Sequence, residues 1–507
     1  MDGKNILTAD PARDASALNS GRRNRFWFCW LSVFLALASG ALFLSYCGFS
    51  VRCHTDEPGK VRQIMLRERN FNHPLLMLNT AQAVFDASGL APAPQNVVRV
   101  GRAVIGVFAV ITVLAFAAAA EVTAGPVAAL VCGLFLMTSP LMVEVAHYFK
   151  EDPAMTMGLG VAFLGIALFQ KSPTAARLVL MAVGAALAAS GKHLGAAVIP
   201  FCLYAIMRQP EGRAKRMAGF LAVLVGVYAA VNYQTVGQLL LYKERIGREV
   251  DLVNQGGSVP VRNLAARKYL GMLQGNFPWP LFWFVAFGAW VWAREKRRTF
   301  GLAALFAVAL FLAISLVNKT AGRYFLPVDC MACYLAGAGA AWAAARRGSR
   351  WRIAAFWVPL LAAAAIGIPR GWETSRTFKN DTRLEMARWI EANLPANAVI
   401  AQDEFGQFES SPQSDSPYRI PQALFEAGAD VRSVPLERLE AAGVSYVLVV
   451  NPEAATAKKK KWKRARGEPD GPGETWLERC RKIHGLPGGK FVTNVSPGVT
   501  LYRLPAQ

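Results

Sequence analysis

Two acidic dipeptides, each followed directly by a proline, are the residues of this sequence best suited to acid–base chemistry. Asp56–Glu57 stands in HTDEPGKV, and Glu151–Asp152 stands in HYFKEDPAM. Proline suits the first turn of a helix and biases the residue before it towards an extended backbone, so each pair is predicted to lie at the start of a helix. Neighbouring side chains diverge at such a position. Only one of Asp56 and Glu57 is therefore expected to point into a given cleft.

Histidines and cations accompany these acids. Four of the five histidines lie in the segments that carry the acids or in similar polar segments: His54, His73, His147 and His193. With Asp56 and Asp152 they offer nitrogen and oxygen ligands for a divalent ion, but their spacing matches no defined metal motif. Histidines satisfied by hydrogen bonds are the favoured interpretation.

The basic residues of the same segments suggest an anion site. They are Lys150, Lys192 in GKH, and Arg323 in GRYFLP. Guanidinium groups hold phosphate oxygens through two parallel hydrogen bonds, so phosphate is the anion that best suits Arg323. The simpler alternative for Arg323 is a side chain that reaches from an apolar helix to lipid headgroups.

The composition indicates that these residues belong to a membrane protein. The 507 residues are 53% hydrophobic and only 18% charged, with a mean hydropathy of +0.27. The net charge of +22 comes from short basic groups between apolar runs, a distribution typical of membrane topology and not of nucleic-acid binding. The eight cysteines form no CxxC pair, which indicates neither a zinc site nor a disulfide framework.

Apolar runs of nearly the length needed to cross a bilayer predict a polytopic, mainly α-helical bundle of about eleven transmembrane helices. The predicted spans lie near 26–49, 97–119, 124–143, 154–170, 174–190, 194–207, 216–233, 279–293, 300–317, 324–345 and 353–369. The first is interpreted as a retained signal anchor after a polar segment, 1–25. The helix count is least certain over 174–207, where Gly191, Lys192 and His193 interrupt a continuous run.

The basic clusters orient these spans. Those around Arg22, Lys171, Arg208, Arg294 and Arg346 all fall on one side of the predicted bundle, which the positive-inside rule makes cytoplasmic. Both acidic pairs then face outward, the first in a long external loop, 50–96, with amphipathic helices starting at Pro58 and Pro74. Carboxylates near a bilayer are costly unless they are paired or used, so two such pairs on one face predict a carboxylate-lined cavity.

An odd number of spans places residues 370–507 outside as a small soluble domain. The segment DTRLEMARWIEANLP has helical spacing, whereas AVIAQ, GVSYVLVV, KFVTNV and VTLYRL are typical of short strands. This alternation predicts a compact α/β module. The basic run from Lys458 to Arg466 is interpreted as a solvated loop, with contact to anionic headgroups as the alternative.

The order of these features resembles a known superfamily. HTDEPGKV, NFNHPLLM, AHYFKEDPAMT, GKHLGA and GRYFLPV, followed by an external α/β tail, are similar to the GT-C membrane glycosyltransferases. The likeness is greatest to the dolichyl-phosphate-mannose protein mannosyltransferase-like group, glycosyltransferase family 39, with the lipid A aminoarabinose transferases and rhizobial lipopolysaccharide sugar transferases. It extends over residues 26–369, and the order and sidedness of the motifs carry it more than any one of them.

The resemblance implies transfer of a sugar from a polyprenyl-phosphate donor to a hydroxyl of an extracytoplasmic lipid, glycan or protein. It implies that Asp56 is the catalytic carboxylate with Glu57 in support, that Glu151 or Asp152 is the acid of the second loop, and that Arg323 is the basic residue of the last motif. We expect Lys192 and Lys150 to join Arg323 at the donor phosphate. His73, His54 and His193 are expected to shape the cavity, and a divalent metal ion at Asp56 and Asp152 is left open.

Two other classes of function compete with this interpretation. A transporter or flippase for a lipid-linked or anionic substrate would carry charges at the bilayer midplane and inverted repeats, neither of which is evident in the sequence. A membrane scaffold that displays the external domain would tolerate changes at both acidic pairs. The interpretation we favour is a glycosyltransferase of the bacterial inner membrane that contacts membrane lipids, a lipid-linked donor and a hydroxyl acceptor, and no nucleic acid.

Overall fold

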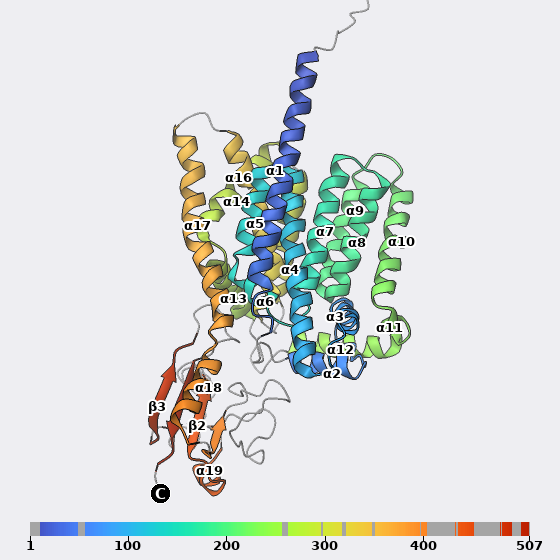
Figure 1. The fold of residues 1–507 in the computed structure, drawn as a ribbon. Coiled ribbons are helices and arrows are strands. Elements are labelled where there is room, and N and C mark those ends of the chain that lie inside the picture. The colour runs from blue at the N-terminus through green and yellow to red at the C-terminus, as the bar shows by residue number, and fades with distance from the viewer. Residues whose placement is uncertain are drawn as a thin grey trace, which may run out of the picture.

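The structure is a computed structural model. It describes residues 11–48, 56–255, 262–295, 298–316, 321–346, 350–395, 397–402, 431, 434–450, 477, 479–488 and 498–505. An elongated helical bundle occupies most of the chain, and a small sheet with its own helices lies beyond one end of the bundle (Figure 1). We call this end, at which Asp152 and Gly191 lie, the pocket end.

Helices lie over every predicted span, several of them with a break. The helices of the bundle are α1 (Pro11–Phe43), α4 (Pro94–Ala124), α5 (Pro126–Met137), α6 (Pro140–Ala146), α7 (Asp152–Lys171), α8 (Ala175–Gly191), η1 (His193–Val198), α9 (Ile199–Met207), α10 (Arg213–Val231), η2 (Trp279–Leu281), α14 (Phe282–Glu295), α15 (Arg298–Leu316), η3 (Gly322–Phe325), α16 (Leu326–Ala345) and α17 (Arg350–Lys379). Among the described residues, six helices are long and apolar enough to cross a membrane, or seven if the bent pair α5–α6 is one span. Eleven complete spans are therefore not confirmed by length and composition, although a mainly helical, polytopic membrane bundle is.

Close packing of α7 against α8 fixes the geometry of the pocket end. A Cβ atom at Gly158 would lie 2.1 Å from the backbone nitrogen of Ala188, and one at Gly191 would lie 2.4 Å from that of Met155. Only glycine permits two helices to approach so closely, as at other small-residue helix contacts in membranes. The start of α7, at Asp152, is consequently held beside the end of α8 and Lys192.

Short amphipathic helices cover the pocket end of the bundle. As predicted, the first loop contains two, α2 (Glu57–Met65) and α3 (Leu76–Ala87). The segment 234–278, expected as a long loop, instead contains α11 (Tyr233–Val236), α12 (Leu239–Gln255) and α13 (Arg262–Asn276). Figure 1 shows α2, α3, α11 and α12 gathered below the membrane-spanning helices.

The C-terminal part forms a four-stranded sheet of order β1-β2-β4-β3. Its strands are β1 (Ile400–Gln402), β2 (Tyr446–Val450), β3 (Arg481–Leu486) and β4 (Val499–Arg503), and its helices are α18 (Thr382–Asn393) and α19 (Leu436–Ala441). β1 and β2 are parallel, and the other two pairings are antiparallel. Met386 and Ile390 of α18 pack on Leu448 and Leu501 of the sheet.

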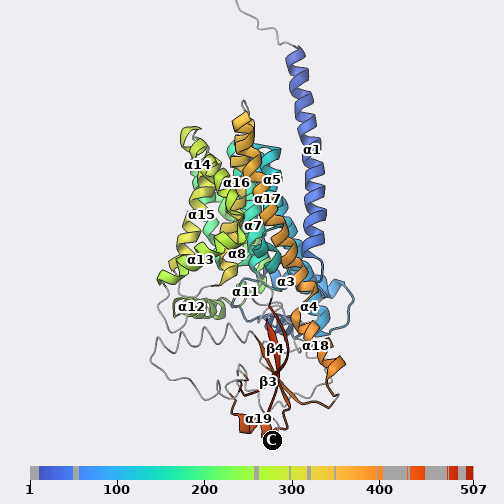
Figure 2. The same ribbon diagram turned by 90° about the vertical axis from the view of Figure 1, so that its left-hand side faces the viewer.

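The predicted α/β tail is thus confirmed, with strands in AVIAQ, GVSYVLVV and VTLYRL. β3 was not expected from the sequence. The predicted strand KFVTNV and the basic run Lys458–Arg466 lie outside the described residues. α17 continues ten residues beyond the expected boundary at 369 and leads to α18, which packs on the sheet (Figure 2).

Candidate active site

One face of α2 carries three polar side chains towards the pocket end of α7. Asp56 is the residue before the helix, and Lys60 and Gln63 follow at intervals of four and three residues, which places all three on the same side of the helix. The Asp56 side chain is 42% exposed, whereas Lys60 is almost fully buried. Asp56 is therefore the member of its dipeptide that is accessible to a ligand.

Glu57 is used for packing. Its carboxylate accepts two hydrogen bonds from Arg102 of α4, from Nε at 2.9 Å and from Nη2 at 2.8 Å. It also accepts one from the backbone N–H of Phe149, at 3.1 Å. Both charged side chains are 2% exposed. Glu57 thus fastens α2 to α4 and to the segment before α7, and it does not line the pocket described below.

The second acidic pair lies behind a layer of cations. Glu151 forms ion pairs with Lys60 and, at 3.3 Å, with Lys150. Asp152 forms ion pairs with Lys192 at 2.6 Å and Arg323 at 3.7 Å. Both acids are completely buried. Their ionised form therefore depends on these four basic groups, because an isolated buried carboxylate would be very costly.

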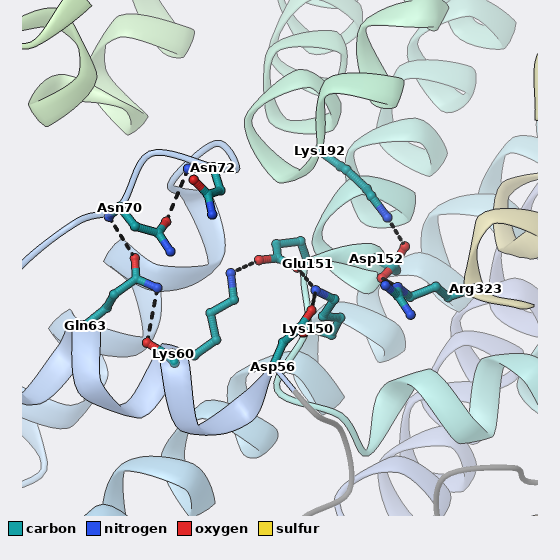
Figure 3. Close-up of polar contacts among 11 residues, drawn as sticks. Asp56, Lys60, Gln63, Asn70, Asn72, Lys150, Glu151, Asp152, Lys192 and Arg323 are labelled. Atoms are coloured by element: carbon teal, nitrogen blue, oxygen red, sulfur yellow. Dashed lines mark hydrogen bonds and ion pairs between the residues drawn. The ribbon is translucent and has the colours of Figure 1, made fainter. Parts of the chain in front are cut away.

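The cations converge from four separate elements. Figure 3 shows Lys60 from α2, Lys150 from the segment before α7, Lys192 from the end of α8 and Arg323 from η3 around the two buried acids. Lys150 also pairs with Asp56. Tyr324 adds its ring, whose centroid lies 4.6 Å from Lys192 Nζ and 5.5 Å from the Arg323 guanidinium. Such contacts favour a cation at this position.

These side chains enclose a polar cavity of about 360 Å³. Its lining consists of Asp56, Gly59, Lys60, Gln63, Asn70, Asn72, His73, Lys150, Lys192, Glu249, Arg323 and Tyr324. Two acids and four cations therefore face the cavity directly, and Glu151 and Asp152 lie beneath it. The predicted residues Asp56, His73, Lys150, Lys192 and Arg323 are brought together in one cavity.

The electrostatics of the cavity keep Glu151 charged and His73 neutral. Burial would raise the pKa of Glu151, but the ammonium groups of Lys150 and Lys60 outweigh it and hold this pKa well below its usual value. Burial lowers the pKa of His73 to about 3; the Glu151 carboxylate favours protonation, whereas Lys60, Lys150 and Lys192 oppose it. At neutral pH His73 is thus an uncharged hydrogen-bonding group.

The remaining histidines take structural positions or lie elsewhere. His193 contacts the Tyr242 hydroxyl at 3.5 Å and does not line the cavity. His147 is buried between the carbonyl oxygens of Val143 and Ser45 and stacks on Phe378 of α17. His54 lies outside the described residues. Within the described part of the chain, no group of three His, Cys, Asp or Glu side chains is placed to hold a metal ion.

Several lining residues were missed by sequence reasoning. Lys60 and Gln63 follow Asp56 at helical spacing, a signal that could have placed them in the cavity. Asn70 and Asn72 flank Phe71 in the NFNHP motif, of which only His73 and Pro74 were interpreted. Glu249 comes from α12, whose approach to the cavity no local pattern indicates.

Comparison with known proteins defines the class of the fold. The chain superposes on ArnT from Cupriavidus metallidurans, in a crystal structure bound to undecaprenyl phosphate, with a TM-score of 0.50 and 15% identity over 92% of this chain and 97% of ArnT. It also superposes on the oligosaccharyltransferase of Archaeoglobus fulgidus in the apo form, with a TM-score of 0.50 and 13% identity over 84% of this chain and 70% of that protein. No protein-family model and no curated protein sequence matches the chain. The chain therefore has the GT-C fold, which confirms the resemblance at the level of the fold.

Proposed function

We propose that the protein is a membrane glycosyltransferase that moves a sugar from a polyprenyl-phosphate donor to a hydroxyl acceptor. The observation that carries this proposal is the cavity itself, in which an accessible carboxylate, Asp56, lies beside Lys150, Lys192 and Arg323. The fold supports it, since the chain shares its fold with ArnT and with an oligosaccharyltransferase. The ArnT structure also contains a polyprenyl phosphate.

One base and one anion site suffice for a direct displacement, which transfers the sugar with inversion at its anomeric carbon. The acceptor oxygen attacks the anomeric carbon, its proton passes to the Asp56 carboxylate, and the bond from the anomeric carbon to the phosphate oxygen breaks. A positioned base is worth about 10² to 10⁴-fold in rate. The leaving phosphate gains negative charge, which Lys192 and Arg323 are placed to stabilise.

Lys150 is suited to link these two events. In the structure it pairs with both Asp56 and Glu151. An incoming phosphate competes for its ammonium group, and a Lys150 that turns to the phosphate no longer opposes protonation of Asp56. Glu151 and Asp152 serve as buried counter-ions that position the cations, and we propose no contact between either acid and the substrate.

The proposed orientation places the cavity outside the cytoplasm. The helix ends that carry Lys171, Arg208, Arg294 and Arg346 are those opposite the pocket end, as in the positive-inside pattern. On this basis we propose that the N-terminus is cytoplasmic and the C-terminal sheet extracytoplasmic. A bacterial inner membrane is part of the same proposal.

The test is a transfer assay with purified protein and a radiolabelled undecaprenyl-phosphate sugar, with and without EDTA. We expect the labelled sugar to move from undecaprenyl phosphate to a hydroxyl group of a lipid or glycan. In parallel, the protein in vesicles reports on the alternative: labelled lipid that crosses the bilayer with its sugar still attached would identify a flippase. Protein that binds no undecaprenyl phosphate and supports neither process would contradict the proposal and favour a scaffold.

A further inference from the structure

The cavity has two chemically different walls. The wall formed by Lys150, Lys192, Arg323 and Tyr324 carries the positive charge, whereas Gln63, Asn70 and Asn72 form a wall of uncharged amides. Figure 3 shows the three amides on one side of the Lys60–Glu151 pair, with Lys192 and Arg323 on the other. A ligand that reaches both walls therefore has a charged end and an uncharged polar end.

The amides are held in place by a chain of hydrogen bonds. Gln63 donates from its amide nitrogen to the Gly59 carbonyl oxygen at 3.2 Å, and its amide oxygen accepts from the Asn70 backbone N–H at 3.2 Å. The amide oxygen of Asn70 in turn accepts from the Asn72 backbone N–H at 3.2 Å. Because a backbone N–H can only donate, these contacts fix which side of the Gln63 and Asn70 amides is oxygen. The amide NH₂ of Asn70 is then left as the group available to the cavity.

The backbone of this segment is shaped to present both asparagines. Phe71 has a φ of 55°, in the left-handed region that a bulky residue rarely adopts. Its ring is buried in the cluster that includes Leu75 and Met77, while Asn70 and Asn72 on either side both line the cavity. Strain of this kind, of order 1–3 kcal/mol, is typical of ligand-binding segments.

We propose that Gln63, Asn70 and Asn72 form the subsite for the donor sugar and that this sugar is neutral and recognised through its hydroxyl groups. The inference rests on the proposed function, which assigns the cationic wall to the donor phosphate. Amides both donate and accept, which matches hydroxyl groups. Gln63, Asn70 and Asn72 themselves offer no carboxylate to a positively charged amino sugar, and Lys60, one turn from Gln63, is already paired with Glu151. The acid contributed by α12, Glu249, lines the same cavity and is the group that would favour an amino sugar instead.

The experiment compares the binding of three probes to full-length protein in detergent: undecaprenyl phosphate, undecaprenyl-phosphate-mannose, and undecaprenyl phosphate carrying a 4-amino pentose. We expect the mannose donor to bind more tightly than the bare lipid phosphate, and the amino-sugar donor to gain nothing. The variants Asn70→Ala and Asn72→Ala should each weaken binding of the mannose donor about five-fold, the effect of one lost hydrogen bond. Binding of bare undecaprenyl phosphate should stay within two-fold of the original.

Two further variants separate recognition from folding. Asn70→Asp keeps the oxygen that accepts from the Asn72 N–H but removes the NH₂ donor, so we expect it to weaken mannose-donor binding as Asn70→Ala does. Gln82→Ala changes an amide of α3 outside the cavity and should have no effect. The inference would be overturned if Asn70→Asp bound the mannose donor normally. It would also be overturned if the amino-sugar donor bound best of the three probes and lost this advantage in Glu249→Gln. If the unaltered protein did not bind bare undecaprenyl phosphate, the proposed function itself would be contradicted.

Discussion

The two acidic dipeptides begin helices in the same way, yet they serve the cavity differently. At the start of α2 the acids separate: Asp56 faces the cavity, and Glu57 turns back to Arg102 of α4. At the start of α7 both acids are buried, and each holds cations that themselves face the cavity. The difference follows from the neighbours of each helix. Arg102 and the backbone N–H of Phe149 bind Glu57 of α2, whereas the close α7–α8 contact lies beside the start of α7. One pair thus presents a carboxylate to the cavity, whereas the other pair binds the cations that line it.

The largest effect should come from Asp56. Asp56→Asn keeps the shape of the side chain but cannot accept the proton, so the transfer rate should fall about 10² to 10⁴-fold. Thermal unfolding should change little, because the carboxylate is partly exposed. The matched control is Asp86→Asn, an exposed acid of α3 that pairs with Arg67 outside the cavity. Transfer at the original rate in Asp56→Asn would remove this residue from the mechanism.

Replacement of Glu57, in contrast to that of Asp56, should mainly reduce stability. Removing one partner from a buried, bidentate ion pair costs about 3–5 kcal/mol, since the other charge is left without compensation. Glu57→Gln should therefore lower the free energy of unfolding by that order, as measured by chemical denaturation in detergent. The double variant Glu57→Gln/Arg102→Met should recover much of the loss. If Glu57→Gln proved fully stable but unable to transfer sugar, Glu57 would belong with Asp56 and the contrast between them would be wrong.

From the sequence it was easier to predict which residues share the cavity than to predict the role of each one. Helix starts at Pro58 and Pro153 and the predicted sidedness indicated a carboxylate-lined cavity, and the order of the GT-C-like motifs added Lys150, Lys192 and Arg323 to Asp56. The structure places all four in one cavity. The choice between Asp56 and Glu57 depends on Arg102, which lies 45 residues away and contacts Glu57 only after α2 has packed on α4. The burial of Asp152 depends likewise on the glycines that bring α7 and α8 together.

The segments far from the motifs were the hardest to predict. Residues 234–278 have enough polar residues to be interpreted as a loop, whereas the structure forms α12 with one apolar and one polar side and brings Glu249 to the cavity. The amphipathic period is present in the sequence, but its partner surface is created only by the folded bundle. The tail was predictable as α/β because alternation of strand and helix is a local signal.

A smaller effect should appear at the cationic wall held by Asp152. A charge-assisted hydrogen bond to phosphate is worth about 1.5–3 kcal/mol, so Arg323→Met should weaken binding of undecaprenyl phosphate about 10 to 100-fold. Arg323→Lys should restore part of it, because the charge remains and the bidentate geometry does not. Arg208→Met, at the opposite end of the bundle, is the control. Equal affinities in all four proteins would show that the lipid phosphate binds elsewhere.

The smallest effect concerns His73, which lines the same cavity. Burial holds its pKa at about 3 in the folded protein, against an ordinary value of 6.5. Between these values the unfolded chain binds more protons than the folded one, so this histidine lowers stability as the pH falls below 6.5. The Glu151 carboxylate contributes its own acid-dependent loss only below about pH 4.5, because Lys150 and Lys60 outweigh burial and hold its pKa well below its usual value. Measured from pH 6.5 to 5, the melting temperature of His73→Asn should therefore fall less steeply than that of the unaltered protein. The control Gln82→Ala, outside the cavity, should fall as steeply as the unaltered protein. An unchanged slope in His73→Asn would mean that His73 takes up a proton in the folded protein and that the cavity tolerates a further positive charge.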